Sequence, residues 1–311
     1  MIYGILLAST SVCFYTAFGA FAQYFELNPV DLILTRGTIH FITLFIAIFC
    51  TGQRLELSRS VIGGGLIAFL CHSLYILSLH LLPLGTAVIF GRSTAPFTAF
   101  FARVLAKEPV SLVKGVCIAL LLLGQLFIIQ PPFIFSEFNG VSSMGIRECF
   151  GIAAGLSCAI LEGLLLVYIR VTEVSKSQIL LIEGGFSILG GLAIGPWMPE
   201  SQIFHTTVDE FPTVTLKVTS GATFAVTGLI LWTFAIGKAP SVLLSLISST
   251  ECVTSFGVQM FLFKEALNVL QIIGVVLVMI SLVVATFYDS HLETKKKDYI
   301  KMEEKTMKTQ P

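Results

Sequence analysis

The chain of 311 residues is 55% hydrophobic and 12% charged, whereas about a quarter of the residues in a typical soluble domain are charged. This composition excludes an ordinary water-soluble protein and predicts that a lipid bilayer surrounds most of the chain. The formal net charge of zero argues against nucleic acid as a partner.

Ten apolar runs are each long enough to cross a bilayer as a helix, which takes about 20 residues. Charged or turn-forming residues separate them, for example Asn28 with Pro29, Pro131 with Pro132, and Lys264 with Glu265. In chain order the runs are 2–25, 30–51, 61–80, 84–106, 111–130, 148–170, 177–198, 217–237, 241–263 and 268–287. The sequence therefore predicts an all-α membrane protein with ten transmembrane helices.

Basic residues are distributed unevenly between the loops. If the N-terminus is cytosolic, the even-numbered loops hold most of the Lys and Arg: Arg54, Arg59, Arg103, Lys107, Lys114, Arg170, Lys176 and Lys238. Because cytosolic loops carry an excess of Lys and Arg, we predict that both termini are cytosolic. The lysine-rich residues 289–311 lack apolar periodicity and are predicted to be a disordered cytosolic tail. The plasma membrane and the endoplasmic reticulum or Golgi membranes all fit this pattern.

The two halves of the chain match weakly but in a shared order. Arg36 aligns with Glu183 at one sequence offset, and Lys107 aligns with Lys264 at a slightly larger offset. Each half has five predicted spans, so the second half enters the membrane in the opposite sense, which is the inverted-repeat arrangement of many secondary transporters. We predict a five-helix repeat over 1–135, a linker over 136–147 and a second five-helix repeat over 148–288.

Three motifs carry a family resemblance: Leu82 to Ala87 opens the fourth span, Leu105 to Glu108 closes it, and Ile129 to Phe135 follows the fifth span. Together with the ten spans, they resemble the EamA-type drug/metabolite transporter superfamily, and most closely the G subgroup of solute carrier family 35. The resemblance extends over roughly residues 2–288. It implies a ten-helix carrier with a central cavity, but not the solute, because members carry amino acids, organic acids, drugs or nucleotide sugars. Arg92 departs from the family pattern, in which small polar residues are usual at mid-span.

Five ionisable side chains lie well inside the apolar runs, namely Arg36, Arg92, Glu162, Glu183 and Glu251. A charge at the bilayer centre costs about 3 kcal/mol on insertion scales, so each of these should face the bundle interior and find a partner. Arg36 and Glu183 occupy equivalent positions in the two halves and are predicted to be a structural charge pair. Arg92 and Glu251 lie at the mid-span depth where inverted-repeat transporters bind solutes; a structural ion pair is the alternative for these two.

The predicted substrate-binding residues are Arg92, Glu162, Glu251, Ser248, Ser255 and Tyr15. In the ninth span, serines and Glu251 recur every three or four residues and are expected to form a polar stripe on one helix face. Arg92 can offer two parallel donors to a carboxylate or phosphate. Two basic and three acidic buried groups leave one glutamate without a basic partner, so Glu251 or Glu162 is the candidate proton carrier.

These features predict a secondary transporter of a small organic solute that works by alternating access; an anionic solute and proton coupling are both open. No enzyme motif, cofactor fingerprint or zinc spacing is present in the sequence, so no catalytic residue, cofactor or metal is predicted. The scattered cysteines are predicted to be packing residues. Packing is also the favoured prediction for His72, with a proton relay as the alternative, and for Tyr75 and Trp232, with the lining of a cavity as the alternative. The alternative function is a non-transporting membrane partner that regulates another membrane protein. A homo-oligomer is also open.

Overall fold

The structure is a computed structural model of the 311-residue chain. The described residues are 2–52, 55, 57–107, 111–130, 145–172, 174–207, 210–236, 238–239, 241–262, 264 and 268–308, with side chains described through 288 except at 129. Within these ranges the chain forms helices and no β-strand. The predicted motif at Pro131 and Pro132 and most of the predicted linker lie outside the described residues.

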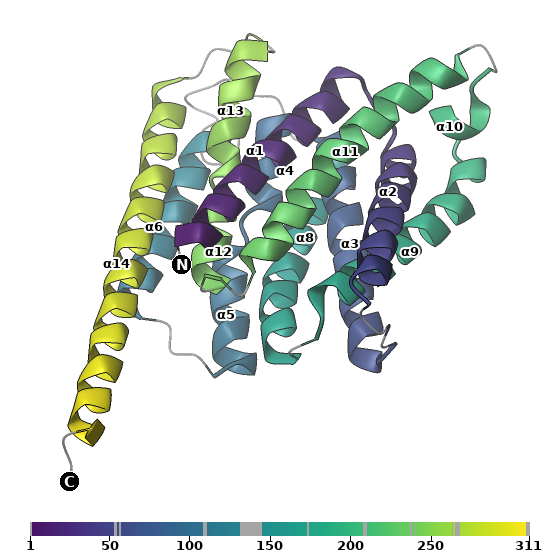
Figure 1. Ribbon diagram of the computed structural model, residues 1–311. Coiled ribbons are helices and arrows are strands. Elements are labelled where there is room, and N and C mark those ends of the chain that lie inside the picture. The colour runs from purple at the N-terminus through teal and green to yellow at the C-terminus, as the bar shows by residue number, and fades with distance from the viewer. Residues whose placement is uncertain are drawn as a thin grey trace.

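The described helices follow the predicted apolar runs (Figure 1). The first half contains α1 (Ile2–Tyr24), α2 (Pro29–Cys50), α3 (Arg59–Leu81), α4 (Leu84–Gly91), α5 (Ala95–Leu105) and α6 (Leu112–Ile129). The second half contains α8 (Ile146–Thr172), α9 (Lys176–Ile194), the 3₁₀ turn η1 (Gly195–Trp197), α10 (Gln202–His205), α11 (Phe211–Ala235), α12 (Ser241–Ser248), α13 (Glu251–Leu262) and α14 (Val269–Lys308).

Local sequence signals explain several helix starts. Asn28 caps α2, where its side-chain oxygen accepts a hydrogen bond of 2.9 Å from the Val30 amide, and Pro29 occupies the first helical position. Ser58 and Ser111 cap α3 and α6 in the same way. Such side chains satisfy amide donors that have no partner within the helix.

The fourth and ninth predicted runs are each divided into two helices. α4 ends at Gly91 and α5 begins at Ala95, followed by Pro96, whose ring has no amide hydrogen to continue the helix. α12 ends at Ser248 and α13 begins at Glu251. The sequence predicts one apolar run over 241–263, whereas the chain forms two helices there, and the hydroxyls of Ser249 and Thr250 between them donate to the carbonyl oxygens of Ser245 and Ile247.

Among the described residues, eight segments are long and apolar enough to cross a membrane, one of them being α12 and α13 taken together. They confirm an all-α membrane protein. Two of the ten predicted spans fall outside this set. The run 84–106 is divided into α4 and α5, and the run 111–130 forms the shorter apolar helix α6.

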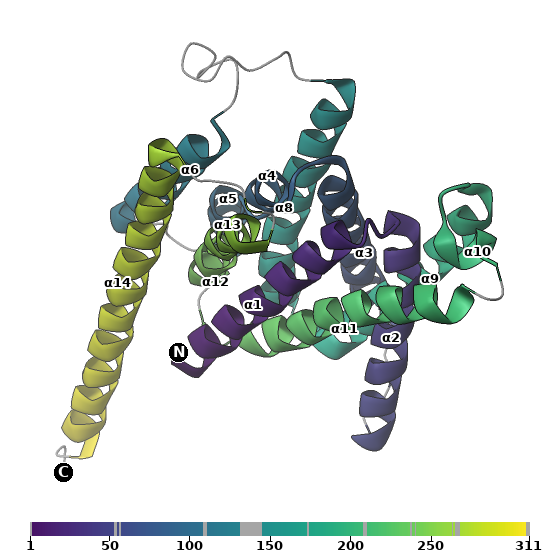
Figure 2. The same ribbon diagram turned by 90° about the horizontal axis from the view of Figure 1, so that it is seen from above.

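Four helix pairs make the most extensive contacts: α2 with α9, α6 with α14, α3 with α8 and α1 with α11. Figure 2 shows α1 beside α11 and α6 beside α14. Glycine permits the closest approaches. A Cβ atom at Gly274 would lie 2.5 Å from the carbonyl oxygen of Gly124, and one at Gly37 would lie 2.4 Å from Cβ of Ser187. The α6–α14 and α2–α9 contacts therefore depend on small residues, as is common between membrane helices.

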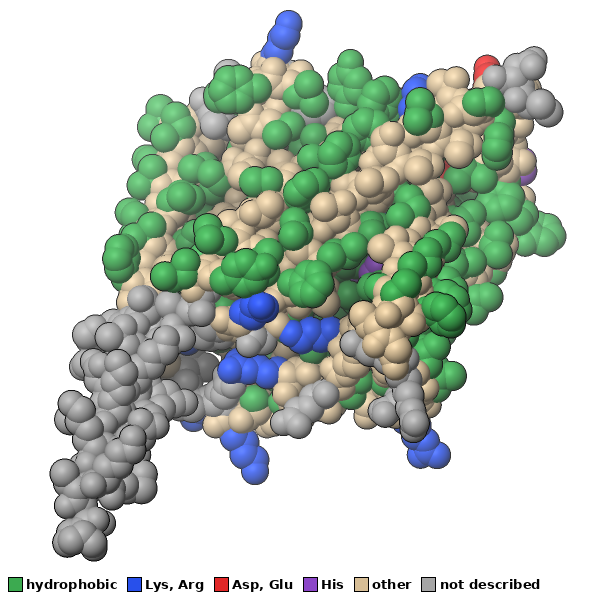
Figure 3. Space-filling view, in the orientation of Figure 1, with side chains coloured by type: hydrophobic (Ala, Val, Ile, Leu, Met, Phe, Trp, Pro, Cys, Tyr) green, Lys and Arg blue, Asp and Glu red, His purple; other side chains and the backbone are tan. Residues whose placement is uncertain are grey.

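The outer surface is largely apolar, with exposed side chains such as Phe49, Trp197 and Phe261. In the face shown in Figure 3, hydrophobic side chains spread over the middle, and Lys and Arg side chains gather mainly toward the lower end. α14 continues as a helix to Lys308, whereas the sequence predicted a disordered tail from residue 289. The many Lys, Glu and Met residues in this segment are good helix formers, which accounts for the difference.

Candidate functional site

Arg92 lies at the break between α4 and α5, in the interior of the bundle. It is the C-terminal capping residue of α4, and only 5% of its surface is exposed. Its carbonyl oxygen accepts a hydrogen bond of 2.7 Å from Oγ of Ser249, which lies in the corresponding break between α12 and α13. Glu251 is the first residue of α13. A cation at a helix C-terminus and an anion at a helix N-terminus are both electrostatically favoured.

The guanidinium of Arg92 binds two carboxylates from the second half of the chain. Its Nε donates to Oε2 of Glu251 at 2.7 Å, and its Nη1 donates to Oε2 and Oε1 of Glu162 at 2.9 and 3.1 Å. All three side chains are buried. This cluster, the Arg92 centre, therefore has two carboxyl groups for one guanidinium.

Two tyrosine rings complete the Arg92 centre. Cζ of Arg92 lies 4.6 Å from the ring centroids of both Tyr15 and Tyr75, a distance at which a cation is attracted to an aromatic face. The hydroxyl of Tyr75 donates a hydrogen bond of 2.5 Å to Oε1 of Glu251. Within the described part of the chain, Nη2 of Arg92 is buried without a hydrogen-bond partner. One guanidinium donor thus remains unused.

The structure brings together four of the six predicted binding residues: Arg92, Glu162, Glu251 and Tyr15. Ser248 and Ser255 are buried, but their hydroxyls have no hydrogen-bond partner among the described residues. Sequence reasoning missed Ser249, and it favoured packing for Tyr75 over the lining of a cavity. A polar hydroxyl in the middle of an apolar span was the available signal for Tyr75, since a buried tyrosine usually hydrogen-bonds through that group.

A second charged cluster surrounds Glu183. Arg36 Nη2 donates to Oε1 of Glu183, so the predicted pair is in contact. Two histidines join it: Nδ1 of His72 lies 3.4 Å from Oε1, and Nδ1 of His40 lies 2.8 Å from Oε2 without the orientation of a hydrogen bond. The ring of His72 also lies 2.9 Å from the carbonyl oxygen of Ala68. The Glu183 cluster therefore offers one carboxylate to three basic side chains.

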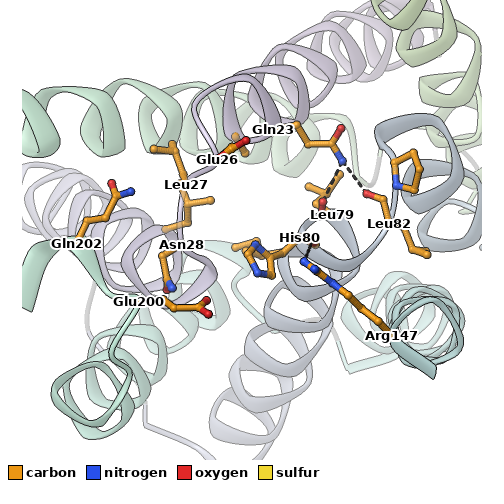
Figure 4. A pocket seen from close by; sticks show the side chains of 14 residues that line it. Gln23, Glu26, Leu27, Asn28, Leu79, His80, Leu82, Arg147, Glu200 and Gln202 are labelled. Atoms are coloured by element: carbon orange, nitrogen blue, oxygen red, sulfur yellow. Dashed lines mark hydrogen bonds between the residues drawn. The ribbon is translucent and has the colours of Figure 1, made fainter. Parts of the chain in front are cut away.

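One cavity, of about 570 Å³, lies where α1 ends and includes Gln23, His80, Arg147 and Glu200 in its lining. Figure 4 shows Gln23 donating to the carbonyl oxygens of Leu79 and Leu82, and Arg147 donating to that of His80. These bonds connect α1 and α8 to the C-terminal end of α3 and to Leu82, which follows it. They define the rim of a polar opening.

A second cavity, of about 540 Å³, is lined by Lys176, Lys238 and apolar residues of α2, α9 and α11. Nζ of Lys238 lies 4.6 Å from the ring centroid of Tyr3 at the start of α1, so this cavity is at the opposite end of α1 from the first. A small cavity of about 30 Å³ shares Lys176 with it and reaches Tyr15, His72 and Glu162. The Arg92 centre thus lies between two openings and borders the inner extension of one.

Known proteins are similar to this chain in sequence and in fold. The family model of the EamA-like transporter family matches residues 2–130. Residues 2–130 therefore resemble an EamA-like domain. Solute carrier family 35 member G1 of Mus musculus is 28% identical over 166 residues, which are 51% of this chain. The match spans 40% of the mouse protein's length.

A crystal structure of another protein aligns with 93% of this chain and with 98% of the other protein's chain, with a TM-score of 0.67 and 18% sequence identity. The two proteins therefore share the fold. The resemblance drawn from the motifs is confirmed: residues 2–130 match the EamA-like transporter family, and a member of the G subgroup of solute carrier family 35 is similar in sequence. Together with the eight apolar spans, it identifies a multi-pass integral membrane protein.

Proposed function

We propose that this protein is a secondary transporter that carries a small organic solute across a membrane by alternating access. The observation that carries the proposal is the Arg92 centre. Charged side chains from both halves of the chain meet there, where the helices α4–α5 and α12–α13 are broken, and a cavity lies toward each end. Broken helices with charged groups at mid-depth are typical of solute sites in secondary transporters.

The helix contacts support ten spans in two inverted five-helix repeats. The proposal pairs α1 with α8, α2 with α9, α3 with α11, α4–α5 with α12–α13 and α6 with α14. When the halves are exchanged, the contacts α2–α9 and α6–α14 map onto themselves, and α3–α8 maps onto α1–α11. The four most extensive contacts are therefore those expected of two related halves around a pseudo-two-fold axis.

Charge supports an orientation with cytosolic termini. The cavity near the start of α1 has Lys176 and Lys238 in its lining, whereas the opposite cavity has Glu26 and Glu200 beside Arg147. Under the positive-inside rule, the lysine-lined end faces the cytosol. α14 runs downward in Figure 1, toward the end of the molecule where Lys and Arg side chains gather in Figure 3, which supports a cytosolic C-terminus.

The unused donor of Arg92 supports an anionic or carbonyl-bearing solute. Nη2 is buried without a partner, and a buried donor without a partner costs about 1–3 kcal/mol. A solute oxygen that accepts from Nη2 removes this cost without displacing either glutamate. The rings of Tyr15 and Tyr75 on the guanidinium leave its edge as the site of contact.

The excess carboxyl group supports proton coupling. Of the two candidates, Glu251 is bonded through one oxygen to Tyr75 and through the other to Arg92. Glu162 borders the small cavity that extends toward the lysine-lined end. We therefore favour Glu162 as the group that exchanges a proton with water.

The test is uptake of radiolabelled organic acids, amino acids and nucleotide sugars into proteoliposomes, with and without an inward proton gradient. Saturable uptake of one solute class is expected for wild type and for Arg103→Ala, which changes an exposed arginine of α5. Arg92→Ala is expected to abolish it. Equal uptake by Arg92→Ala and Arg103→Ala would remove the Arg92 centre from the mechanism.

A non-transporting regulatory partner is the competing function. It predicts that folded protein takes up no solute and that deletion of residues 289–311 removes its effect on another membrane protein, while substitutions at the Arg92 centre have none. If the protein is a transporter, folded protein takes up solute, substitutions at the Arg92 centre reduce uptake, and deletion of residues 289–311 does not.

A further inference from the structure

Two cysteines from different halves of the chain meet beside the Arg92 centre. Cys71 of α3 and Cys158 of α8 are 2% and 0% exposed, and their Sγ atoms lie 3.7 Å apart. Glu162 follows Cys158 by one helical turn on α8, and its carboxylate lies within 4.8 Å of both sulfurs. Two thiols and one carboxyl group therefore converge in the bundle interior.

The sulfur separation fits two ligands of a single ion. Zinc–thiolate bonds of about 2.3 Å at a tetrahedral angle place two sulfurs about 3.8 Å apart. A disulfide needs about 2.05 Å, so it would require the two sulfur atoms to move closer together, whereas a shared ion would not. Two thiols in van der Waals contact lie at a similar distance, so the sulfur separation alone does not indicate an ion. Glu162 supplies a third ligand beside the two sulfurs.

We propose that Cys71, Cys158 and Glu162 form a binding site for a thiophilic divalent cation such as Zn²⁺ or Cd²⁺. Soft thiolate ligands select such ions over Mg²⁺ and Ca²⁺. The small cavity that reaches the Arg92 centre is lined by Cys71 and Glu162. It provides an entry path and room for a water or solute atom as the fourth ligand.

The charge balance of the site is favourable despite the nearby guanidinium. Binding releases two thiol protons to solvent and admits one divalent ion, so the net charge of the buried region does not change. Arg92 contacts both oxygens of Glu162 and also Glu251. When one oxygen of Glu162 binds the ion, Arg92 remains hydrogen-bonded to Glu251 and to the other oxygen of Glu162.

A bound ion would join the two halves of the molecule. Cys71 belongs to the first half, whereas Cys158 and Glu162 belong to the second. An ion at this point resists any relative movement of α3 and α8 and withdraws part of Glu162 from Arg92. The site goes beyond the proposed transport function and does not depend on it, because metal binding is measurable without a solute.

The experiment is a Cd²⁺ titration of purified, phosphine-reduced protein in detergent, followed by thiolate-to-cadmium absorption in the ultraviolet. The exposed Cys13, Cys50 and Cys149 are first replaced by alanine. This background protein is expected to bind one Cd²⁺ through two thiolates, to release it to Zn²⁺ and to ignore Mg²⁺. Cys71→Ser and Cys158→Ser are expected to lose at least half of the absorption and to bind about tenfold or more weakly.

Cys117→Ser is the matched control, because Cys117 is also buried but lies in α6. It should leave the titration unchanged. Glu162→Gln should retain the absorption but weaken binding. If one of the two variants Cys71→Ser and Cys158→Ser does not elute as a single species, the Cd²⁺ titration of the other is sufficient for the test. Absence of the absorption in the background protein, or an equal response in Cys71→Ser and Cys117→Ser, would overturn the proposal, whatever the outcome of the uptake assay.

Discussion

The Arg92 centre and the Glu183 cluster contain the same kinds of charged group in opposite proportions. At the Arg92 centre one guanidinium is shared by two carboxylates and lies at helix breaks. In the Glu183 cluster one carboxylate faces Arg36 and two histidines, on helices without a break. Helices α2 and α9 approach closely there through Gly37 and Gly184.

The difference teaches that a buried charge is not by itself a sign of function. The helix breaks and the excess carboxyl group distinguish the Arg92 centre, and we infer that they allow it to change partners. The Glu183 cluster lies between unbroken helices that pack closely through Gly37 and Gly184. We therefore propose that the first binds the solute and the second stabilises the contact between the two halves.

The largest expected effect comes from neutralising the Arg92 centre. The triple variant Arg92→Met, Glu162→Gln and Glu251→Gln should lose uptake entirely while keeping a melting temperature close to that of wild type, because no unpaired buried charge remains. Proteoliposome uptake and thermal melting measure the two properties. If the triple variant still carries solute, the Arg92 centre is not the solute site.

Removing the basic partner from the Glu183 cluster should act mainly on stability. Arg36→Ala leaves Glu183 buried without its arginine and is expected to cost about 3–5 kcal/mol of folding free energy. The double variant Arg36→Met, Glu183→Leu should recover most of the thermal stability and of the uptake. If the double variant is stable but inactive, the Glu183 cluster takes part in transport.

The two glutamates of the Arg92 centre should differ in their response to a proton gradient. Glutamine cannot release a proton, so Glu162→Gln is expected to carry solute at a rate that no longer depends on the gradient. Glu251→Gln should reduce uptake but keep that dependence. The measurement is initial uptake with and without an inward gradient, with Glu148→Gln, an exposed site on α8, as control. Reversed phenotypes would assign the proton to Glu251.

The smallest effect is expected from Tyr75→Phe. This change removes the hydroxyl that donates to Glu251 and keeps the ring that contacts Arg92. One hydrogen bond to a charged group is worth about 1.5–3 kcal/mol; because this bond joins two groups of the protein and does not involve the solute, the concentration for half-maximal uptake should rise by less than the roughly tenfold that its full energy would give. Tyr168→Phe, which removes a hydroxyl bonded to the Ser60 carbonyl, should leave that concentration unchanged.

The sequence by itself determined the membrane class, the approximate helix positions and the chemical nature of the buried groups. These follow from local properties: apolar length, turn residues such as Asn28 and Pro29, and the cost of placing a charge in hydrocarbon. Equivalent positions in the repeat also suggested the contact between Arg36 and Glu183, which is present.

Only the tertiary structure decided which groups share Arg92. Glu162 and Glu251 lie 70 and 159 positions from it in the chain, and helical periodicity within one span says nothing about which faces of distant spans meet. The break at Ser249 was hidden for the same reason, since its hydroxyl bonds the carbonyl of Arg92 on another helix. The pairing of Cys71 with Cys158 likewise depends on how α3 packs against α8.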